Sequence, residues 1–405
     1  MAGKKRKRVE AEQVQGLRQF QHLRPLLARL HRAGCERDKA GNRDLHFDEY
    51  CMLVLLYLFN PICSSLRALQ EASQLAKVQK RLKVPASSLG SLSEAVQVFD
   101  PELLKPILEE LGEQLQPVAQ NPKLGEIKQL LTIVDGTLLR ALPQITAAAW
   151  QGQPYKARSD AWRLHTHFEV VRSVPVEMTL TTGRNQGEAH ERQVLKRQLK
   201  PEHCYVMDRG YATWELFNQI VEVGSSYVCR IYDDSAWKVE QTRPLSQEAQ
   251  QAGVLADVVA TLGAYAKTRP RHLVRVVTIK ATPHRKRSGH HGNAGPSNNG
   301  TLLIATNLLD VPAEIVALLY QYRWTIEVFF RFFKHVLGCR HLISQDEAGI
   351  QIQTYCAIIA CLLISLYTGR KATLRTYRMI SFHLMGWASD EELERYLDKL
   401  AIQTA

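Results

Sequence analysis

Leu318 to Gly338 read LLYQYRWTIEVFFRFFKHVLG, and the interpretation of the whole chain starts from this stretch. Its spacing predicts a helix, in which successive residues turn by about 100°. One edge of that helix carries a carboxylate, two cations and a phenol, namely Tyr320, Arg323, Glu327 and Lys334. The neighbouring apolar stripe should face the core, with Ile326, Phe329, Phe330, Phe333 and Leu337. The polar edge is either a site for a metal ion and phosphate oxygens or a solvated helix face.

The bulk composition is that of a globular protein with a basic surface. The 405 residues are enough for two or three domains, and 45% of them are hydrophobic and 23% charged. The 52 Lys and Arg against 40 Asp and Glu give a net charge of +12. This balance favours a polyanionic partner such as nucleic acid.

The chain is expected to be cytoplasmic, with reduced thiols and no membrane span. Its eight cysteines include no CxxC pair and no Cys/His cluster at zinc spacing. The N-terminal MAGKKRKRVE is charged but has no apolar stretch behind it, so it is not a secretory signal. The dense apolar part of the stretch from Ala348 to Gly369 is short of the roughly 20 residues that a span needs, which predicts a buried helix.

The N-terminal third is predicted to be helical. Two helices, about Ser65 to Leu82 and Leu92 to Phe99, flank the turn VPASSLGS, and Ser91 with Glu94 would form a capping box. The basic segment KVQKRLK before this turn makes the pair compatible with a helix-turn-helix DNA reader. Many helical bundles contain such a pair, so both interpretations stay open.

Short β-rich runs begin near Lys128. The strands predicted from them, with helices between the later ones, indicate an α/β layer with a mixed sheet and span residues 129–134, 164–171, 174–182, 203–207 and 226–231. Residues 233–307 form an excursion with β signals of their own at Leu273 to Lys280 and Thr301 to Asn307, around a cationic, Gly/Asn-rich loop. The His284, His290 and His291 of that loop have no partner at a metal-binding spacing.

Two aspartates follow apolar β-formers in the same context. Asp135 precedes Gly136, and Asp208 precedes Arg209-Gly210. Each alone is an ordinary turn residue, but two of them in one α/β layer, with Glu327 on a later helix, make a site of three carboxylates. Such oxygen ligands suit two Mg²⁺ or Mn²⁺ ions about 3.5–4 Å apart, which catalyse phosphodiester exchange without an organic cofactor.

These segments resemble the DDE transposases of bacterial insertion sequences. LTIVDGT, YVMDRGY and the Tyr-x2-Arg-x3-Glu-x6-Lys run match the group of insertion sequence family four type that bears the YREK signature, from about Gln129 to Leu366. The resemblance implies an α/β fold in which a ribonuclease-H-like core with a mixed sheet is interrupted by a β-rich insertion. It also implies metal-dependent cut-and-paste transposition, with cleavage at terminal inverted repeats and strand transfer to target DNA.

The resemblance assigns a role to each matched residue. Asp135, Asp208 and Glu327 become the catalytic metal ligands, and Tyr320, Arg323 and Lys334 become contacts to DNA phosphates. Family members that cut through a DNA hairpin hold a flipped base against an aromatic ring. Trp324 is the candidate for that ring, and a core tryptophan is the alternative.

Other residues lie beside the two strand carboxylates. Arg209 and Arg140 are either phosphate-steering groups that bind DNA or ordinary surface residues, and His165 and His167 are either proton-transfer groups or packed or solvated histidines. Trp237 in the insertion is a second candidate for the stacking role.

The expected domains follow from the same argument. They are a basic leader (1–12), a helical DNA-binding domain (13–125), the core in two parts (126–232 and 311–370), the insertion (233–310) and C-terminal helices (371–405). The expected partner is double-stranded DNA, with a homodimer in the synaptic complex and a nucleoid-associated location in the bacterial cytoplasm. The alternative function is a non-catalytic DNA-binding relative, such as a repressor or domesticated transposase, although such a protein gains nothing from three repelling carboxylates.

Overall fold

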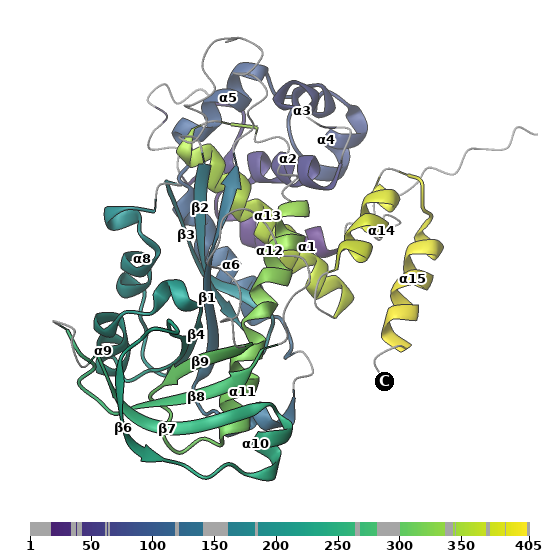
Figure 1. Ribbon diagram of the computed structural model, residues 1–405. Coiled ribbons are helices and arrows are strands. Elements are labelled where there is room, and N and C mark those ends of the chain that lie inside the picture. The colour runs from purple at the N-terminus through teal and green to yellow at the C-terminus, as the bar shows by residue number, and fades with distance from the viewer. Residues whose placement is uncertain are drawn as a thin grey trace, which may run out of the picture. The chain divides into compact units, whose positions relative to one another are not determined.

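The computed structural model describes most of the chain (Figure 1). The described residues are 18–33, 38, 43–60, 63, 65–117, 121–140, 161–182, 185–263, 268–281, 300–336, 343–344, 346–369, 373–384 and 386–402. The basic leader and the histidine-bearing loop of the insertion lie outside these ranges, and so does the side chain of Arg140. The described residues form two compact units, one from 1–116, 139–160 and 330–405 and the other from 117–138 and 161–329.

The first unit is helical in the residues that the structure describes. Its elements are α1 (Arg18–Ala28), α2 (Phe47–Phe59), α3 (Leu66–Ser73), α4 (Ala76–Leu82), α5 (Leu89–Val98), η4 (Pro101–Leu104), α6 (Lys105–Glu113), α13 (Glu347–Thr368), α14 (Leu374–Leu384) and α15 (Asp390–Ile402). The apolar α13 packs against α2 and α6. Its stretch Glu347–Leu366 is the one described segment long and apolar enough to span a membrane, and 89% of its most apolar window is buried inside the protein.

Local capping explains where the helices of this unit begin. Ser389 and Glu392 bond reciprocally to each other's backbone N–H and form the predicted capping box before α15. The predicted box at Ser91 is wrong, because the hydroxyl of Ser88 accepts from the Ser91 N–H and starts α5 three residues earlier. The expected single helix from Ser65 to Leu82 is two helices, α3 and α4, with a break between them.

Among the residues that the structure describes, the second unit is built on one mixed sheet of nine strands. The strands are β1 (Leu130–Arg140), β2 (Ala161–Glu169), β3 (Val174–Thr182), β4 (His203–Met207), β5 (Ser226–Arg230), β6 (Trp237–Thr242), β7 (Val254–Leu262), β8 (Val274–Lys280) and β9 (Thr301–Thr306). Their spatial order is β3-β2-β1-β4-β5-β9-β8-β7-β6. β1, β4 and β5 are parallel, whereas β2 and β3 form an antiparallel hairpin. The mixed sheet expected from the sequence is confirmed.

The register of β1 against β4 fixes the position of the two aspartates. The parallel pairing runs from Leu130 opposite His203 to Val134 opposite Met207. The next residue on each strand is an aspartate, Asp135 on one and Asp208 on the other. β1 continues to Arg140, so Asp135 lies within a strand and not at its end as the sequence suggested. What ends at Val134 is the pairing with β4.

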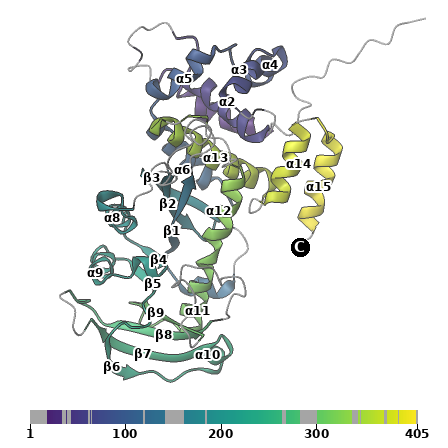
Figure 2. The ribbon, with the colours of Figure 1, turned by 45° about the horizontal axis from the view of Figure 1, so that its top comes forward.

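Helices cover both faces of this sheet (Figures 1 and 2). α8 (Glu191–Arg197) and α9 (Trp214–Glu222) lie on one face, and α11 (Ala313–Tyr322) lies on the other. The rings of Phe217 on α9 and Tyr227 on β5 stack with centroids 4.1 Å apart inside the core. The shorter elements are η5 (Pro122–Glu126), η6 (Gly187–Ala189), η7 (Arg209–Tyr211) and α10 (Gln247–Gln251).

The β-rich excursion continues the central sheet. β9 pairs antiparallel with β5, and β8, β7 and β6 follow outward in a meander. The sequence indicated β8 and β9 but missed β6 and β7. β6 (WKVEQT) is largely exposed and lacks a clear alternation of polar and apolar residues, while β7 contains a buried Asp257 in its apolar run.

A buried ion pair ties this meander to the segment that leads into α11. Arg275 on β8 donates two hydrogen bonds of 2.8 Å to the carboxylate of Asp257, and their side chains are 1% and 3% exposed. The same guanidinium donates to the carbonyls of Leu308 and Val311, just before α11 begins. Arg275 therefore sets where α11 enters the fold.

We expect Arg275→Met to lower the free energy of unfolding by about 3–5 kcal/mol, because it leaves the buried Asp257 carboxylate without its bidentate partner. The matched control is Arg271→Met, whose partner Glu222 and own side chain are 54% and 80% exposed, and which should cost at most about 1 kcal/mol. Urea unfolding followed by circular dichroism measures both. Equal losses would contradict the assigned role of Arg275.

Candidate active site

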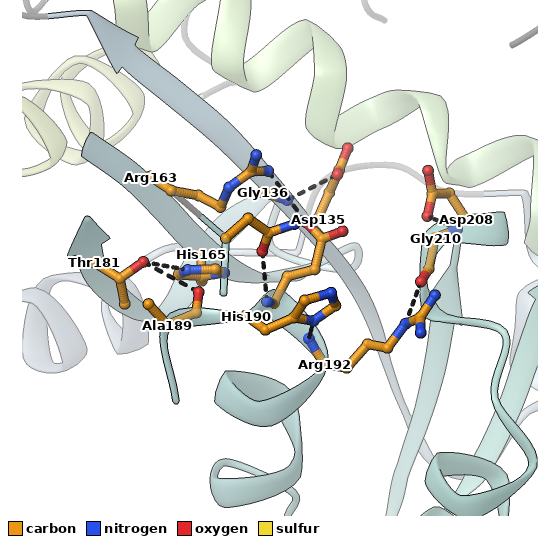
Figure 3. A network of polar contacts seen from close by, with 12 residues as sticks. Asp135, Gly136, Arg163, His165, Thr181, Ala189, His190, Arg192, Asp208 and Gly210 are labelled. Carbon is orange, nitrogen blue, oxygen red and sulfur yellow. Dashed lines mark hydrogen bonds and ion pairs between the residues drawn. The ribbon is translucent and has the colours of Figure 1, made fainter. Parts of the chain in front are cut away.

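Asp135 and Asp208 are each oriented by a glycine N–H (Figure 3). The Gly136 N–H donates to Asp135 Oδ1 and the Gly210 N–H donates to Asp208 Oδ1, both at 2.7 Å. The bond from Gly210 makes Asp208 the cap of the short helix η7. The carboxylates are thus held at the end of the parallel pairing, where the two strands diverge.

Asp135 lies close enough to Asp208, Glu327 and Arg323 for their charges to act on it. Burial first, and then the negative charges of Asp208 and Glu327, raise the pKa of Asp135 to about 7, while the Arg323 guanidinium and the Gly136 N–H oppose the rise. Glu327 is almost 200 positions away from Asp135 in the sequence. The raised pKa therefore marks a buried carboxyl that also faces other negative charges.

Glu327 and Arg323 lie where two helices meet. The expected continuous helix is broken at Arg323, so that α11 ends at Tyr322 and α12 runs over Trp324–Val336. The Arg323 guanidinium donates to Glu327 Oε1 at 2.6 Å, and the two side chains are 19% and 25% exposed. Arg323 therefore neutralises part of the charge of the carboxylates.

Tyr320 lies on α11, about one turn before Arg323, and is 9% exposed. Burial raises the pKa of its phenol to about 12, although Arg323 and Arg230 lower it. The Arg323 guanidinium lies 6.0 Å from the ring centroid. Tyr320 therefore keeps its proton at neutral pH and can donate a hydrogen bond.

Of the remaining predicted site residues, Lys334 and Trp324 lie on α12 and Arg209 lies in η7. Lys334 is half-buried on α12, about two turns beyond Glu327. Trp324 is 41% exposed at the start of α12, so the alternative of a core tryptophan is wrong. Arg209 follows Asp208 directly, and its guanidinium lies 5.1 Å from the ring centroid of Tyr232.

His165 and His167 are packed inside the protein. They are 3% and 2% exposed, and burial lowers the pKa of His165 to about 4 and that of His167 to about 3. His165 Nε2 pairs with the hydroxyl of Thr181 (Figure 3). Both imidazoles are therefore neutral at physiological pH, which favours the packed histidine over the proton-transfer role.

Two residues next to the aspartates went unnoticed in the sequence. Arg163 on β2 and Glu191 at the start of α8 form an ion pair of 3.1 Å beside Gly136 and Gly210. Neither residue stands in a recognisable motif. Only the strand pairing and the helix that follows the hairpin bring them to the site.

Comparison with known proteins gives the family. The family model described as "Transposase DDE domain" matches residues 126–363, more than half of the chain. The chain belongs to the DDE transposase domain family. It is 28% identical over 234 residues to the "Probable transposase for insertion sequence element IS5377" of Geobacillus stearothermophilus, covering 56% of each chain. It thus spans about half the length of this curated relative.

A solved structure titled as the piggyBac transposase synaptic complex with hairpin DNA aligns over 95% of this chain and 84% of its own. The sequence identity is 10% and the TM-score 0.42. We draw no conclusion about fold or function from so low a score.

The donor set of this DDE transposase domain suits a divalent cation. Carboxylate oxygens are the preferred ligands of Mg²⁺ and Mn²⁺, and such an ion would relieve the repulsion that raises the pKa of Asp135. Among the described residues, no group of three His, Cys, Asp or Glu is already close enough to hold a metal. Glu327 is instead engaged by Arg323.

We expect Gly210→Ala to weaken metal binding by this domain about 10-fold or more, because the new Cβ would lie 2.9 Å from Asp208 Oδ1 and would displace that carboxylate. The control Gly136→Ala should change affinity little, since its Cβ meets only Arg163 and Glu191 side-chain atoms at 3.4 Å. Calorimetric titration with Mn²⁺ measures both variants. A Gly210→Ala protein that binds like wild type would refute the assigned position of Asp208.

Proposed function

We propose that this chain is a DNA transposase that cuts the ends of its own insertion sequence and transfers them to target DNA in a metal-dependent reaction. The observation that carries the proposal is that the negative charges of Asp208, next to an adjacent parallel strand, and of Glu327, on a distant helix, act on the buried carboxyl of Asp135. Membership of the DDE transposase domain family supports the same chemistry.

The catalytic core is ribonuclease-H-like in this proposal. The spatial order β3-β2-β1-β4-β5, with an antiparallel hairpin on one side and three parallel strands on the other, supports that assignment. Residues 126–232 and 311–370 make up the core, residues 233–310 are an insertion that widens its sheet, and 371–405 are C-terminal helices. The insertion separates the second aspartate from Glu327 in the sequence.

Asp135, Asp208 and Glu327 would hold two Mg²⁺ or Mn²⁺ ions in the active site. When bound, such ions activate an attacking oxygen and stabilise the leaving one. On holding an ion, Glu327 would give up the hydrogen bond that it accepts from Arg323, which would leave the guanidinium for a phosphate oxygen. Tyr320 stays protonated and donates to a phosphate oxygen.

The phosphate contacts extend along α12 and to the strand end. Lys334 supplies a cation beyond Glu327, and Arg209 one beside Asp208. The exposed indole of Trp324 is placed for stacking on an unpaired base, which is worth about 1–3 kcal/mol per base. This stacking supports cleavage through a DNA hairpin as one route.

The helical residues 13–125 are proposed to bind the terminal inverted repeats. Lys77, Lys80 and Lys83 on and after α4 are exposed and precede the turn into α5. Their position supports contacts to the DNA backbone. The proposed assembly is a homodimer that joins two element ends in the cytoplasm, since one protomer holds a single carboxylate set.

We expect Asp135→Asn, Asp208→Asn and Glu327→Gln each to abolish cleavage while leaving DNA binding intact, because each removes a metal ligand and no DNA-binding group. The substrate is DNA carrying the inverted repeats that flank the reading frame, and products are resolved on sequencing gels in Mg²⁺. Normal cleavage by any of these variants would refute the three-carboxylate site. Wild-type binding without cleavage would favour the non-catalytic relative.

We expect Arg323→Ala and Lys334→Ala to weaken binding of a pre-cut element end and to reduce the slope of log affinity against log salt by about 1 each. The matched control is Arg331→Ala, an exposed cation on the same helix. Fluorescence anisotropy at several salt concentrations gives the slopes. If Arg331→Ala lowers the slope as much, the contacts are not specific to the YREK residues.

A further inference from the structure

An ion pair lies beside Gly136 and Gly210, the glycines that follow the two aspartates. Arg163 Nη1 on β2 donates to Glu191 Oε2 on α8 at 3.1 Å, and both side chains are 17% exposed. Figure 3 shows Arg163 beside Gly136, with Asp208 and Gly210 on the neighbouring segment. Nothing in the DDE chemistry described above uses this pair.

The two glycines leave the room that this pair occupies. A Cβ on Gly136 would lie 3.4 Å from both Arg163 Nη1 and Glu191 Oε2, and a Cβ on Gly210 would lie 3.3 Å from Glu191 Oε1. The two oxygens of one carboxylate thus face the two glycines. Each glycine also donates the N–H that orients its aspartate. Glu191 therefore packs against both glycine-bearing segments.

The start of α8 fixes Glu191 in turn. Its backbone N–H donates to Asn185 Oδ1 at 2.9 Å, and the next residue, Arg192, donates from Nε to the Gly210 carbonyl at 2.6 Å (Figure 3). The Gly210 carbonyl is thus bound to α8 through Arg192, and Arg163 and Glu191 pack against Gly136. A displaced Glu191 would remove its packing against both glycines that orient the aspartates.

We propose that Arg163 and Glu191 are a positioning pair that sets the separation of Asp135 and Asp208 and so the affinity of the site for its divalent cation. This inference rests on the proposed function, because it requires the two aspartates to bind metal. Neither residue touches the DNA or the ion in this proposal. Groups that orient metal ligands typically change affinity about 10–100-fold when they are replaced.

The test is Mn²⁺ binding by the full chain, followed by electron paramagnetic resonance of the free ion. Glu191→Gln and Arg163→Met should each weaken binding about 10-fold or more. The two variants distinguish positioning of the aspartates from a direct electrostatic effect on the ion. If Arg163 acted only through its charge, Arg163→Met would remove a nearby cation and tighten Mn²⁺ binding. Tighter binding by this variant would therefore overturn the proposal.

The structural control is Glu169→Gln at the opposite end of β2. Glu169 accepts two hydrogen bonds from Arg172 and is 3% exposed, whereas Glu191 accepts one from Arg163, so the loss of Glu169 should lower the thermal unfolding midpoint at least as much. It should leave Mn²⁺ affinity unchanged. Equal weakening by Glu169→Gln and Glu191→Gln would show a general loss of stability and refute the positioning role.

Failure of the proposed function gives a different result. A wild-type chain that binds no Mn²⁺, or an Asp135→Asn variant that binds it as tightly, would refute the metal site and this inference with it. Wild-type binding that depends on Asp135 but is unchanged by Glu191→Gln would refute the positioning pair alone.

Discussion

The backbone pairing of β1 with β4 is the constraint on which the rest of the site depends. The two strands run parallel in a register that ends with Val134 opposite Met207, so that an aspartate follows on each strand at the same level of the sheet. Parallel neighbours have the same direction, and their carboxyl ends therefore open at one edge. A slip of one residue would turn one aspartate to the other face of the sheet and destroy the pair.

Placing carboxylates so close together is unfavourable by itself, and the protein offsets that cost with hydrogen bonds and cations. The N–H groups of Gly136 and Gly210 each stabilise one aspartate, and Arg323 holds Glu327. The pKa of Asp135 remains near 7 despite these partners, because burial outweighs them. Ionising Asp135 therefore remains unfavourable, and a divalent cation would stabilise the ionised carboxylate. This property of the fold agrees with the metal-dependent chemistry of the DDE family.

The β-rich insertion extends the central sheet of the core. Its strand β9 adds directly to β5, so the insertion and the three parallel strands share one set of backbone hydrogen bonds. The buried Arg275 then binds both Asp257 and the carbonyls that precede α11. The segment that leads into the helix carrying Tyr320 is thus hydrogen-bonded to the insertion.

The sequence by itself determined the α/β layer, the mixed sheet and the three carboxylates as a hypothesis, because alternation, turn residues and the Tyr-x2-Arg-x3-Glu-x6-Lys spacing are local properties. Tertiary structure alone decided the continuation of the sheet into β6 and β7 and the Arg163–Glu191 pair beside both aspartates. These features arise from contacts between residues far apart in the chain. A sequence pattern within one segment does not specify which distant segment will pack against it. Strand register and helix packing in the tertiary structure specify that contact.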